Sequence, residues 1–344
     1  MKEEGLRFFD AFSGYGGFHL GIERAYDNLR PNELADSQRP EELHESKDKQ
    51  LKWECVGNSE IDKYAEAVYK HHFGGRNYGD ITKIVADELP DFDLFVGGFP
   101  CQAFSIAGKR RGFDDTRGTL FFDIARILKE KHPRHVLLEN VKGLLSHDSG
   151  RTFKTIISTL AELGYSVEWQ VLNAKNFGVP QNRERVFIIG HLGGFSGRQV
   201  FPIRESSQGV SESDEQKPQT NITNTIDTRT GAYPKFGQYV KEAVPVLTPD
   251  RIEKRQNGRR FKTDGEPMFT LNTQDKHGVY DGFKIRRLTP KECERLMGLP
   301  DGWTAKGDFD GEIKEISDTQ RYKLCGNGVV VNVVEEIIKT LKPV

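Results

Sequence analysis

Cysteine, long apolar runs and excess charge are all scarce in this sequence, and each shortage excludes a class of protein. The four cysteines form no C-x-x-C pair and no Cys/His spacing typical of zinc, so we expect no metal. Scattered cysteines fit a reducing cytoplasm better than a disulfide framework. No apolar run has membrane length, and the charged start Met1–Glu4 is unlike a signal peptide. The formal net charge is −1, so any nucleic-acid surface must be local.

The first half of the chain alternates short apolar strands with amphipathic helices. Strands are expected over 6–12, 53–58, 93–98, 134–140, 165–172 and 185–191, and helices over 17–29, 61–72, 120–130 and 153–163. Repeated βα units predict the α/β class, with a mostly parallel sheet covered by helices. A chain of 344 residues exceeds one compact core, which suggests two domains.

Two polar segments interrupt this order, and the tail then returns to strong local signals. Residues 30–52 form a charged surface insertion, and 193–220 a linker where we place a domain boundary. Capping boxes begin at Thr289 and Ser317, and a last helix is expected over 329–341.

Cys101 follows the apolar run 93–98 in the loop Phe99-Pro100-Cys101-Gln102. A group at the carboxyl end of such a strand stands where open α/β sheets bind their ligands. A lone cysteine is more often a buried structural residue than a nucleophile, so its role depends on its neighbours.

A glycine-rich turn, Phe12 to Gly17, leads from the first strand into a helix. Its glycines permit a tight turn and close approach of the backbone to a ligand. Alone, the turn suits a dinucleotide, S-adenosylmethionine or no ligand. Glu60 ends the second strand, where a carboxylate binds ribose hydroxyls, although a helix N-terminus would also favour it there. Asp80 would place a second carboxylate near an adenine amino group.

Glu139 ends the strand over 134–140, whose pattern is parallel to that of the strand before Cys101. A thiol and a carboxyl on one rim suit nucleophilic addition assisted by an acid, and the alternative is a solvated loop carboxylate. Gln181, Arg183 and Arg185 alternate along an extended segment and share a face. Two arginines on one face could bind a phosphate or a base carbonyl. The alternative is an edge strand whose charged side chains point to solvent.

Together and in this order, these residues resemble the C5-cytosine DNA methyltransferases. The match runs from Leu6 to Val333 and fails only in the insertion and in the expected recognition region. The family's motifs appear at 10–23, 97–105, 139–141, 181–185, 287–298 and 326–330. Length and spacing are similar to those of small bacterial modification methylases of the HhaI type.

The resemblance implies a Rossmann-like S-adenosylmethionine-dependent sheet with a second, smaller target-recognition domain. The catalytic domain would comprise 1–192 and 318–344, and the recognition domain 193–317, with a DNA cleft between them. Catalysis would use Cys101, Glu139, Arg183 and Arg185. S-adenosylmethionine would contact Phe12, Ser13, Gly14, Gly16, Gly17, Glu60, Ile61, Asp80, Ile81, Pro100, Leu120, Asn327 and Val329. DNA would contact Gln102, Ser105, Lys109, Arg110, Arg117, Gln181, Arg259, Arg260 and Thr270.

Two positions depart from the family pattern. Ile61 stands where members often have Trp, so stacking on adenine would be apolar. Gly328 replaces a frequent Ser, which removes one possible hydroxyl contact to the cofactor.

The implied reaction needs a thiolate on C6 of cytosine, because addition there makes C5 nucleophilic. Glu139 would serve N3 and Arg185 the O2 atom, while Arg183 would hold the neighbouring backbone. The base must leave the duplex, so residues 103–118, with their glycines and basic side chains, are interpreted as a closing loop. The bland alternative is an exposed basic loop.

Three other functions remain open at this point. A tRNA cytosine-5 methyltransferase of the same family would keep the chemistry, but its characteristic Cys-Phe-Thr is absent. A nicotinamide dehydrogenase would use the glycine turn and Glu60 and leave Cys101 without a purpose. An inactive DNA-binding relative is disfavoured because every reacting group is present. We expect a cytoplasmic monomer that binds double-stranded DNA and shares its target with a restriction endonuclease.

A basic run in the middle of the chain is the expected DNA surface. Within residues 251–262, six basic side chains face one acidic residue, Glu253. Such asymmetry is typical of a surface that follows phosphates, although charge runs are often only solvated. Base reading is expected near Thr270–His277, after a strand-like stretch at 269–271.

Overall fold

The computed structural model describes residues 6–27, 53–100, 120–193, 199–203, 244–250, 259–263, 265–280 and 285–341. Its main sheet has six strands: β1 (Arg7–Ala11), β2 (Glu54–Ser59), β3 (Leu94–Gly98), β4 (His135–Val141), β5 (Tyr165–Asn173) and β6 (Glu184–Leu192). Their spatial order is β2-β1-β3-β4-β6-β5. The pairs around β1 and β3 are parallel, whereas β6 runs antiparallel to both β4 and β5.

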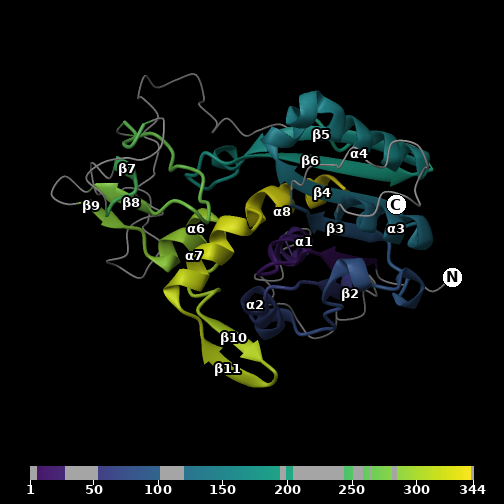
Figure 1. Ribbon diagram of the computed structural model, residues 1–344, viewed down its shortest axis with the longest axis horizontal. Coiled ribbons are helices and arrows are strands. Elements are labelled where there is room, and N and C mark those ends of the chain that lie inside the picture. Colours follow the sequence, from purple (N-terminus) through teal and green to yellow (C-terminus); the bar gives the residue numbers. More distant parts are fainter. Residues whose placement is uncertain are drawn as a thin grey trace, which may run out of the picture.

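Helices cover both faces of this sheet, because successive residues of each buried strand point to opposite sides (Figure 1). Phe8 packs toward α1 (Gly17–Asp27), α2 (Lys63–Phe73) and α8 (Val331–Thr340). Phe9, the next residue, packs toward α3 (Leu120–Lys131) and α4 (Arg151–Glu162). The parallel-rich sheet with helices on both faces confirms the predicted α/β class. The expected strands and helices of this half agree with the structure to within two residues at most ends.

The carboxyl-terminal helix α8 lies against α1, far from it in sequence (Figure 1). The approach is close: a Cβ at Gly21 would lie 2.6 Å from Val334 Cγ1, and one at Gly17 2.8 Å from Val329 Cγ1. Glycine at these two positions therefore lets α1 pack closely against α8 at Gly21 and against the turn before α8 at Gly17.

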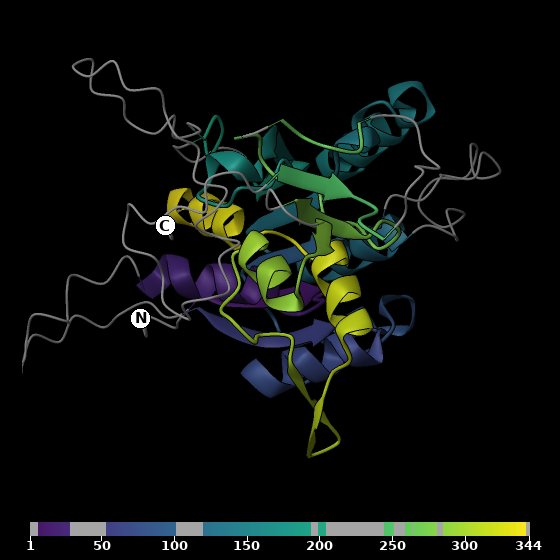
Figure 2. The same ribbon diagram turned by 90° about the vertical axis from the view of Figure 1, so that its left-hand side faces the viewer.

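The remaining elements lie beyond the main sheet. A second, antiparallel sheet comprises β7 (Val244–Leu247), β8 (His277–Tyr280) and β9 (Ile285–Arg287). Two helices follow, α6 (Pro290–Leu296) and α7 (Asp318–Asn327). Between these helices the hairpin β10 (Lys306–Phe309) and β11 (Glu312–Glu315) projects from the body of the molecule (Figure 2). The sequence analysis did not foresee this hairpin, and the domain boundaries stay a prediction.

The two predicted capping boxes have different outcomes. At the start of α6, Thr289 Oγ1 accepts the N–H of Glu292, and the Glu292 carboxylate accepts the N–H of Thr289, which confirms the first box. At the start of α7, the Ser317 side chain makes no capping hydrogen bond, so the second prediction is wrong. The stretch 269–271 is likewise not a strand.

Candidate active site

A pocket of about 520 Å³ opens at the carboxyl ends of β1, β2, β3 and β4. One wall comes from the turn after β1, Glu60, the end of β3 and the Glu139-Asn140-Val141 segment. The opposite wall comes from Thr270–Thr273 and from the end of α7 with the turn Gly326–Val329. Its volume lies in the range of sites for small molecules, and its place is the one that open α/β sheets use for ligands.

Glu60 ties the turn after β1 to the start of α2. Its Oε2 accepts the N–H of Gly14 at 2.9 Å, and its Oε1 accepts those of Ile61 and Asp62 at 2.8 and 2.7 Å. Burial raises the pKa of Glu60, while these donors oppose the rise. The Glu60 carboxylate therefore accepts hydrogen bonds at the N-terminal end of α2, as the alternative interpretation expected. It also lines the pocket.

The predicted cofactor residues divide into two groups. Eight of them line the pocket: Phe12, Ser13, Gly14, Gly17, Glu60, Pro100, Asn327 and Val329. The other five do not, namely Gly16, Ile61, Asp80, Ile81 and Leu120.

The second group has structural roles or lies outside the lining. A Cβ at Gly16 would lie 2.3 Å from Phe73 Cε2, so this glycine serves packing against α2. Ile81 is buried in the core, and Asp80 caps the short helix that begins there by accepting the N–H of Thr82 at 3.0 Å. Leu120 packs on the same core, whereas Ile61 is 76% exposed beside Glu60. Of these apolar side chains only Ile61 is exposed.

Glu139 and Arg185 form an ion pair inside the pocket, with Oε1 and Nε 2.9 Å apart. Glu139 pairs in register with Gly98 at the end of β3, as the predicted common rim requires. Asn140 Nδ2 donates to the carbonyl of Phe99 at 2.8 Å, which holds the chain that leads to Pro100. Burial raises the pKa of Glu139 above its ordinary value, and Arg185 and Arg183 act against this rise.

Cys101 lies outside the described residues, and so do Gln102, Ser105, Lys109, Arg110, Arg117 and the whole predicted closing loop 103–118. Pro100 is the last described residue before them, and it lines the pocket next to Glu139. The other three cysteines are poor nucleophiles, because burial raises the pKa of each thiol, that of Cys55 to about 12.

The side chains of Arg183 and Gln181 both bind the protein itself. The Arg183 guanidinium donates to the carbonyls of Leu271 at 2.7 Å, Gly326 at 3.1 Å and Gly328 at 2.7 Å. Gln181 is fully buried, donates to the Leu296 carbonyl at 2.8 Å and accepts the N–H of Leu271 at 3.0 Å. In this arrangement both residues join the sheet to the second half of the chain.

Arg183 nonetheless contributes charge to the pocket that it lines. Burial lowers its pKa to about 10, so the guanidinium stays protonated at neutral pH. Its positive charge lies near the side chains of Glu139 and Arg185 in the same pocket.

The predicted DNA contacts in the second half of the chain are described only in part. Thr270 lines the pocket and its hydroxyl donates to the carbonyl of Asn182. Arg259 pairs with Glu266 at 2.6 Å, and Arg260 donates to the Thr248 carbonyl at 3.4 Å and lies over the Phe261 ring. Glu266 lies beyond the run 251–262, so the sequence count of its charge left this partner out.

Several pocket residues were missed by the sequence analysis as site residues. Tyr15, Phe18, Asp62 and Lys323 all line the pocket, and Asp62 Oδ2 pairs with Lys323 Nζ at 2.5 Å across two helices. Tyr15 could have been identified from the sequence, since its large side chain interrupts a run of glycines. Lys323 carried none, because its place depends on how α7 packs.

Two kinds of feature are absent from the described part of the chain. No helix there is both long and apolar enough to cross a membrane. No group of three or more His, Cys, Asp or Glu residues there could hold a metal ion.

Comparison with known proteins shows the family of this chain. The model for C-5 cytosine-specific DNA methylases matches residues 6–343. The chain is 37% identical to the type II methyltransferase M1.ScrFI of Lactococcus lactis subsp. cremoris, over 99% of this chain and 79% of that protein. It is 36% identical to the type II methyltransferase M.HhaI of Haemophilus parahaemolyticus, over 97% and 93%.

A likeness in structure extends the comparison of the fold. The crystal structure of S. pombe Dnmt2 methyltransferase superposes with a TM-score of 0.62 at 19% identity, covering 98% of each chain. At this identity the likeness concerns the fold alone. The family model and the relatives agree with the order of the motifs in the sequence, and the chain therefore belongs to the C-5 cytosine-specific DNA methylases, a family of methyltransferase enzymes that use S-adenosylmethionine.

Proposed function

We propose that this enzyme takes one cytosine out of duplex DNA, within a specific short sequence, and methylates it at C5. The observation that carries the proposal is the Glu139–Arg185 pair, 2.9 Å apart, in the same pocket as the turn after β1 and next to Pro100. At one end of the pocket, the acid and the arginine can hydrogen-bond to a base. At the other end, the backbone of the turn after β1 can approach a methyl donor closely, so the two ligands would meet in one cavity.

The residues of the pocket fit S-adenosylmethionine, which supplies the methyl group. The turn Phe12–Gly14 offers backbone for close approach, and Glu60 has a carboxylate at the tip of the second strand. Val329 and Phe18 contribute apolar surface on either side of the same cavity. We assign these residues to binding and orientation of the donor.

Cys101, Glu139 and Arg185 would carry out the chemistry on the base. The Cys101 thiolate adds to C6, and Glu139 gives a proton to N3, so that the electron pair of the C5–C6 bond becomes available at C5. Arg185 holds the O2 atom by its N–H groups. After C5 has received the methyl group and S-adenosylhomocysteine has left, C5 gives up its proton to solvent and the C5–H electron pair re-forms the C5–C6 double bond. The C6–S bond breaks with its electron pair returning to sulfur, and N3 returns its proton to Glu139.

Purified enzyme should transfer tritium from labelled S-adenosylmethionine to plasmid DNA, and bisulfite sequencing should find the modified cytosines in one short sequence. S-adenosylhomocysteine should bind the enzyme in a calorimeter, whereas NAD should not. Label that enters transfer RNA and not DNA would favour the RNA-modifying alternative. No transfer to either nucleic acid would refute the proposal.

We further propose a biological role and a DNA-facing surface. The type II relatives suggest that methylation protects DNA from a restriction endonuclease that recognises the same sequence. The region around β7 and β8, with Arg259, would contact phosphates and help to select the target. A plasmid methylated by this enzyme should therefore resist a nuclease of matching specificity.

Arg259→Ala should weaken DNA binding and flatten its dependence on salt. A single phosphate contact corresponds to a change of about 0.9 in the slope of log K against log salt concentration. Arg260 is expected to contribute less, since it already contacts Thr248 and Phe261, so the double variant should lose nearer one unit than two. Binding titrations at several salt concentrations measure both variants.

Two further variants make this test specific. Glu266→Gln removes the partner of Arg259 and should strengthen binding, because the guanidinium is then released for phosphate. Lys314→Ala removes a basic residue from the exposed hairpin β10–β11, away from β7–β9, and should leave the slope unchanged (Figure 1). A slope that Arg259→Ala leaves intact would remove this residue from the DNA surface.

A further inference from the structure

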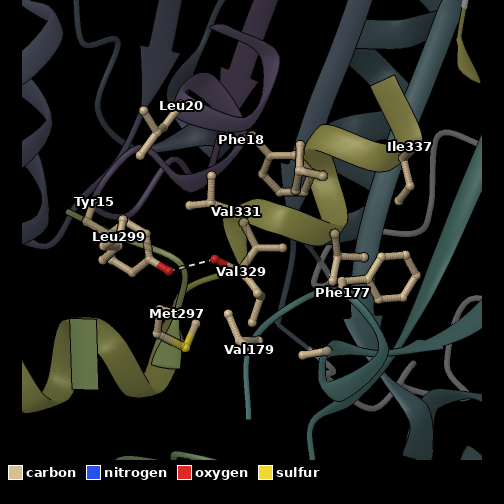
Figure 3. Close-up of a cluster of buried hydrophobic side chains, with 14 of the residues drawn as sticks. Tyr15, Phe18, Leu20, Phe177, Val179, Met297, Leu299, Val329, Val331 and Ile337 are labelled. Carbon is tan, nitrogen blue, oxygen red and sulfur yellow. Dashed lines mark hydrogen bonds between the residues drawn. The ribbon is translucent and has the colours of Figure 1, made fainter. Parts of the chain in front are cut away.

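Tyr15 is a large buried side chain within the glycine-rich turn after β1. Only 1% of it is exposed, and its hydroxyl donates to the carbonyl of Val329 at 2.6 Å (Figure 3). Its own carbonyl accepts the indole N–H of Trp303 at 3.0 Å. Tyr15 therefore joins the first turn of the sheet to the last turn of the chain, and both turns line the pocket.

Gly328 is glycine because of Tyr15 and not because of its own backbone. Its φ of −76° and ψ of 169° are extended values that any residue adopts. A Cβ there, however, would lie 2.1 Å from Tyr15 Cε1, 2.3 Å from Cζ and 2.5 Å from the hydroxyl oxygen. The phenol ring occupies the volume that a side chain at 328 would need, so the two positions are coupled.

Two side chains from other parts of the chain donate hydrogen bonds to carbonyls of the turn Gly326–Val329. Arg183 binds the carbonyls of Gly326 and Gly328, and Tyr15 binds that of Val329. Val329 Cγ1 in turn touches the position of Gly17, at the start of α1. The Tyr15 bond thus sets how far this turn stands from the opposite wall of the pocket.

We infer that Tyr15 and Gly328 are a coupled pair of positioning residues that sets the affinity of the pocket for the methyl donor. The inference rests on the proposed function, since it takes S-adenosylmethionine as the ligand. Tyr15 acts through the Val329 carbonyl and the turn behind it.

Tyr15→Phe keeps the ring and removes the hydroxyl. The Val329 carbonyl then loses its partner, and one such hydrogen bond corresponds to roughly a five-fold change in an equilibrium constant. We expect the Kd for S-adenosylhomocysteine to rise about five-fold by calorimetry. The KM for S-adenosylmethionine should rise equally, while kcat at saturation changes less than about two-fold, because the reacting groups are untouched.

The coupling is tested by rescue. Gly328→Ser alone should raise the Kd at least about ten-fold, since the new side chain meets the phenol ring. Tyr15→Leu combined with Gly328→Ser vacates the outer part of that ring and should bind S-adenosylhomocysteine more tightly than Gly328→Ser alone. Independent positions would instead give effects that add.

Tyr165→Phe is the matched control, because Tyr165 is also buried and donates its hydroxyl to a carbonyl, that of Pro133, at 2.9 Å. It does not line the pocket, so its removal should leave the Kd unchanged whatever it does to thermal stability. If the wild-type enzyme binds no S-adenosylhomocysteine, the proposed function fails. If the wild type binds and Tyr15→Phe binds equally well, or the double variant shows no rescue, the inference alone is overturned.

Discussion

Cys101→Ala should abolish methylation and leave DNA binding largely intact. Without the thiol nothing adds to C6, and C5 stays too poor a nucleophile to take a methyl group. With 5-fluorocytosine at the target, the wild-type enzyme should form a covalent complex in the presence of S-adenosylmethionine. Fluorine replaces the C5 proton that a base would remove, so the elimination that releases Cys101 cannot occur. The complex is seen on a denaturing gel, and Cys101→Ala should form none.

Cys55→Ala is the matched control for the thiol. Its sulfur lies on β2, where it contacts the Tyr69 hydroxyl and the Gly57 carbonyl, and burial raises its pKa to about 12. This variant should still methylate and still be trapped. Methylation by Cys101→Ala at the wild-type rate would show that the covalent mechanism is wrong.

Glu139→Gln should lower kcat by about 10²-fold or more, the usual scale for a positioned acid. The amide keeps the shape of the carboxyl and cannot pass a proton to N3. The Kd for S-adenosylhomocysteine should change little, since the Glu139–Arg185 ion pair lies beside Gly98 at the end of β3, whereas the residues assigned to the donor are those of the turn after β1 and Glu60. Single-turnover rates with saturating donor and DNA measure the effect.

The pH dependence follows from the burial of Glu139. Burial raises its pKa, so the carboxyl keeps its proton to a higher pH than an exposed glutamate does. The wild-type kcat should therefore fall as the pH rises through that pKa, and Glu139→Gln should lack this fall.

Glu184→Gln serves as the control for Glu139. Glu184 is the neighbouring acid on β6, half-exposed and paired with Lys142 at 2.9 Å. It does not line the pocket, so its loss should leave kcat and the pH profile unchanged. A Glu139→Gln variant that loses donor binding instead of rate would reassign Glu139 to the donor end of the pocket.

The local part of this fold could be predicted because short-range signals determine it. The apolar run before Gly98 and the sequence Thr289-Pro290 with Glu292 three residues after the cap each specify an element from a few neighbouring side chains. Ser317 shows the limit of such signals. The same spacing of residues occurs there, and the helix forms without the side-chain bond.

The direction and neighbours of the strands could not be predicted in the same way. β5 and β6 were expected as strands, but β6 lies between β4 and β5 and runs antiparallel to both. Strand order depends on which edges meet when the chain collapses, and a single strand's composition carries little of that information.

Gln181 and Arg183 show the same division within the site. Alternation correctly predicted that polar groups recur along this segment, and it could not tell which neighbours would cover them. Leu271, Leu296 and Gly326 arrive from between 88 and 143 residues away and turn both side chains inward.

The sequence by itself determined most elements around the main sheet, the family and the chemistry-bearing residue types, since each follows from patterns within a few residues or from motifs in a set order. Only the tertiary structure decided that Arg183 holds three carbonyls, that Glu139 is buried against Arg185, and that Tyr15 requires glycine at 328. Those facts arise from contacts between distant segments. Their energies depend on burial and close packing, which exist only once the whole chain has folded.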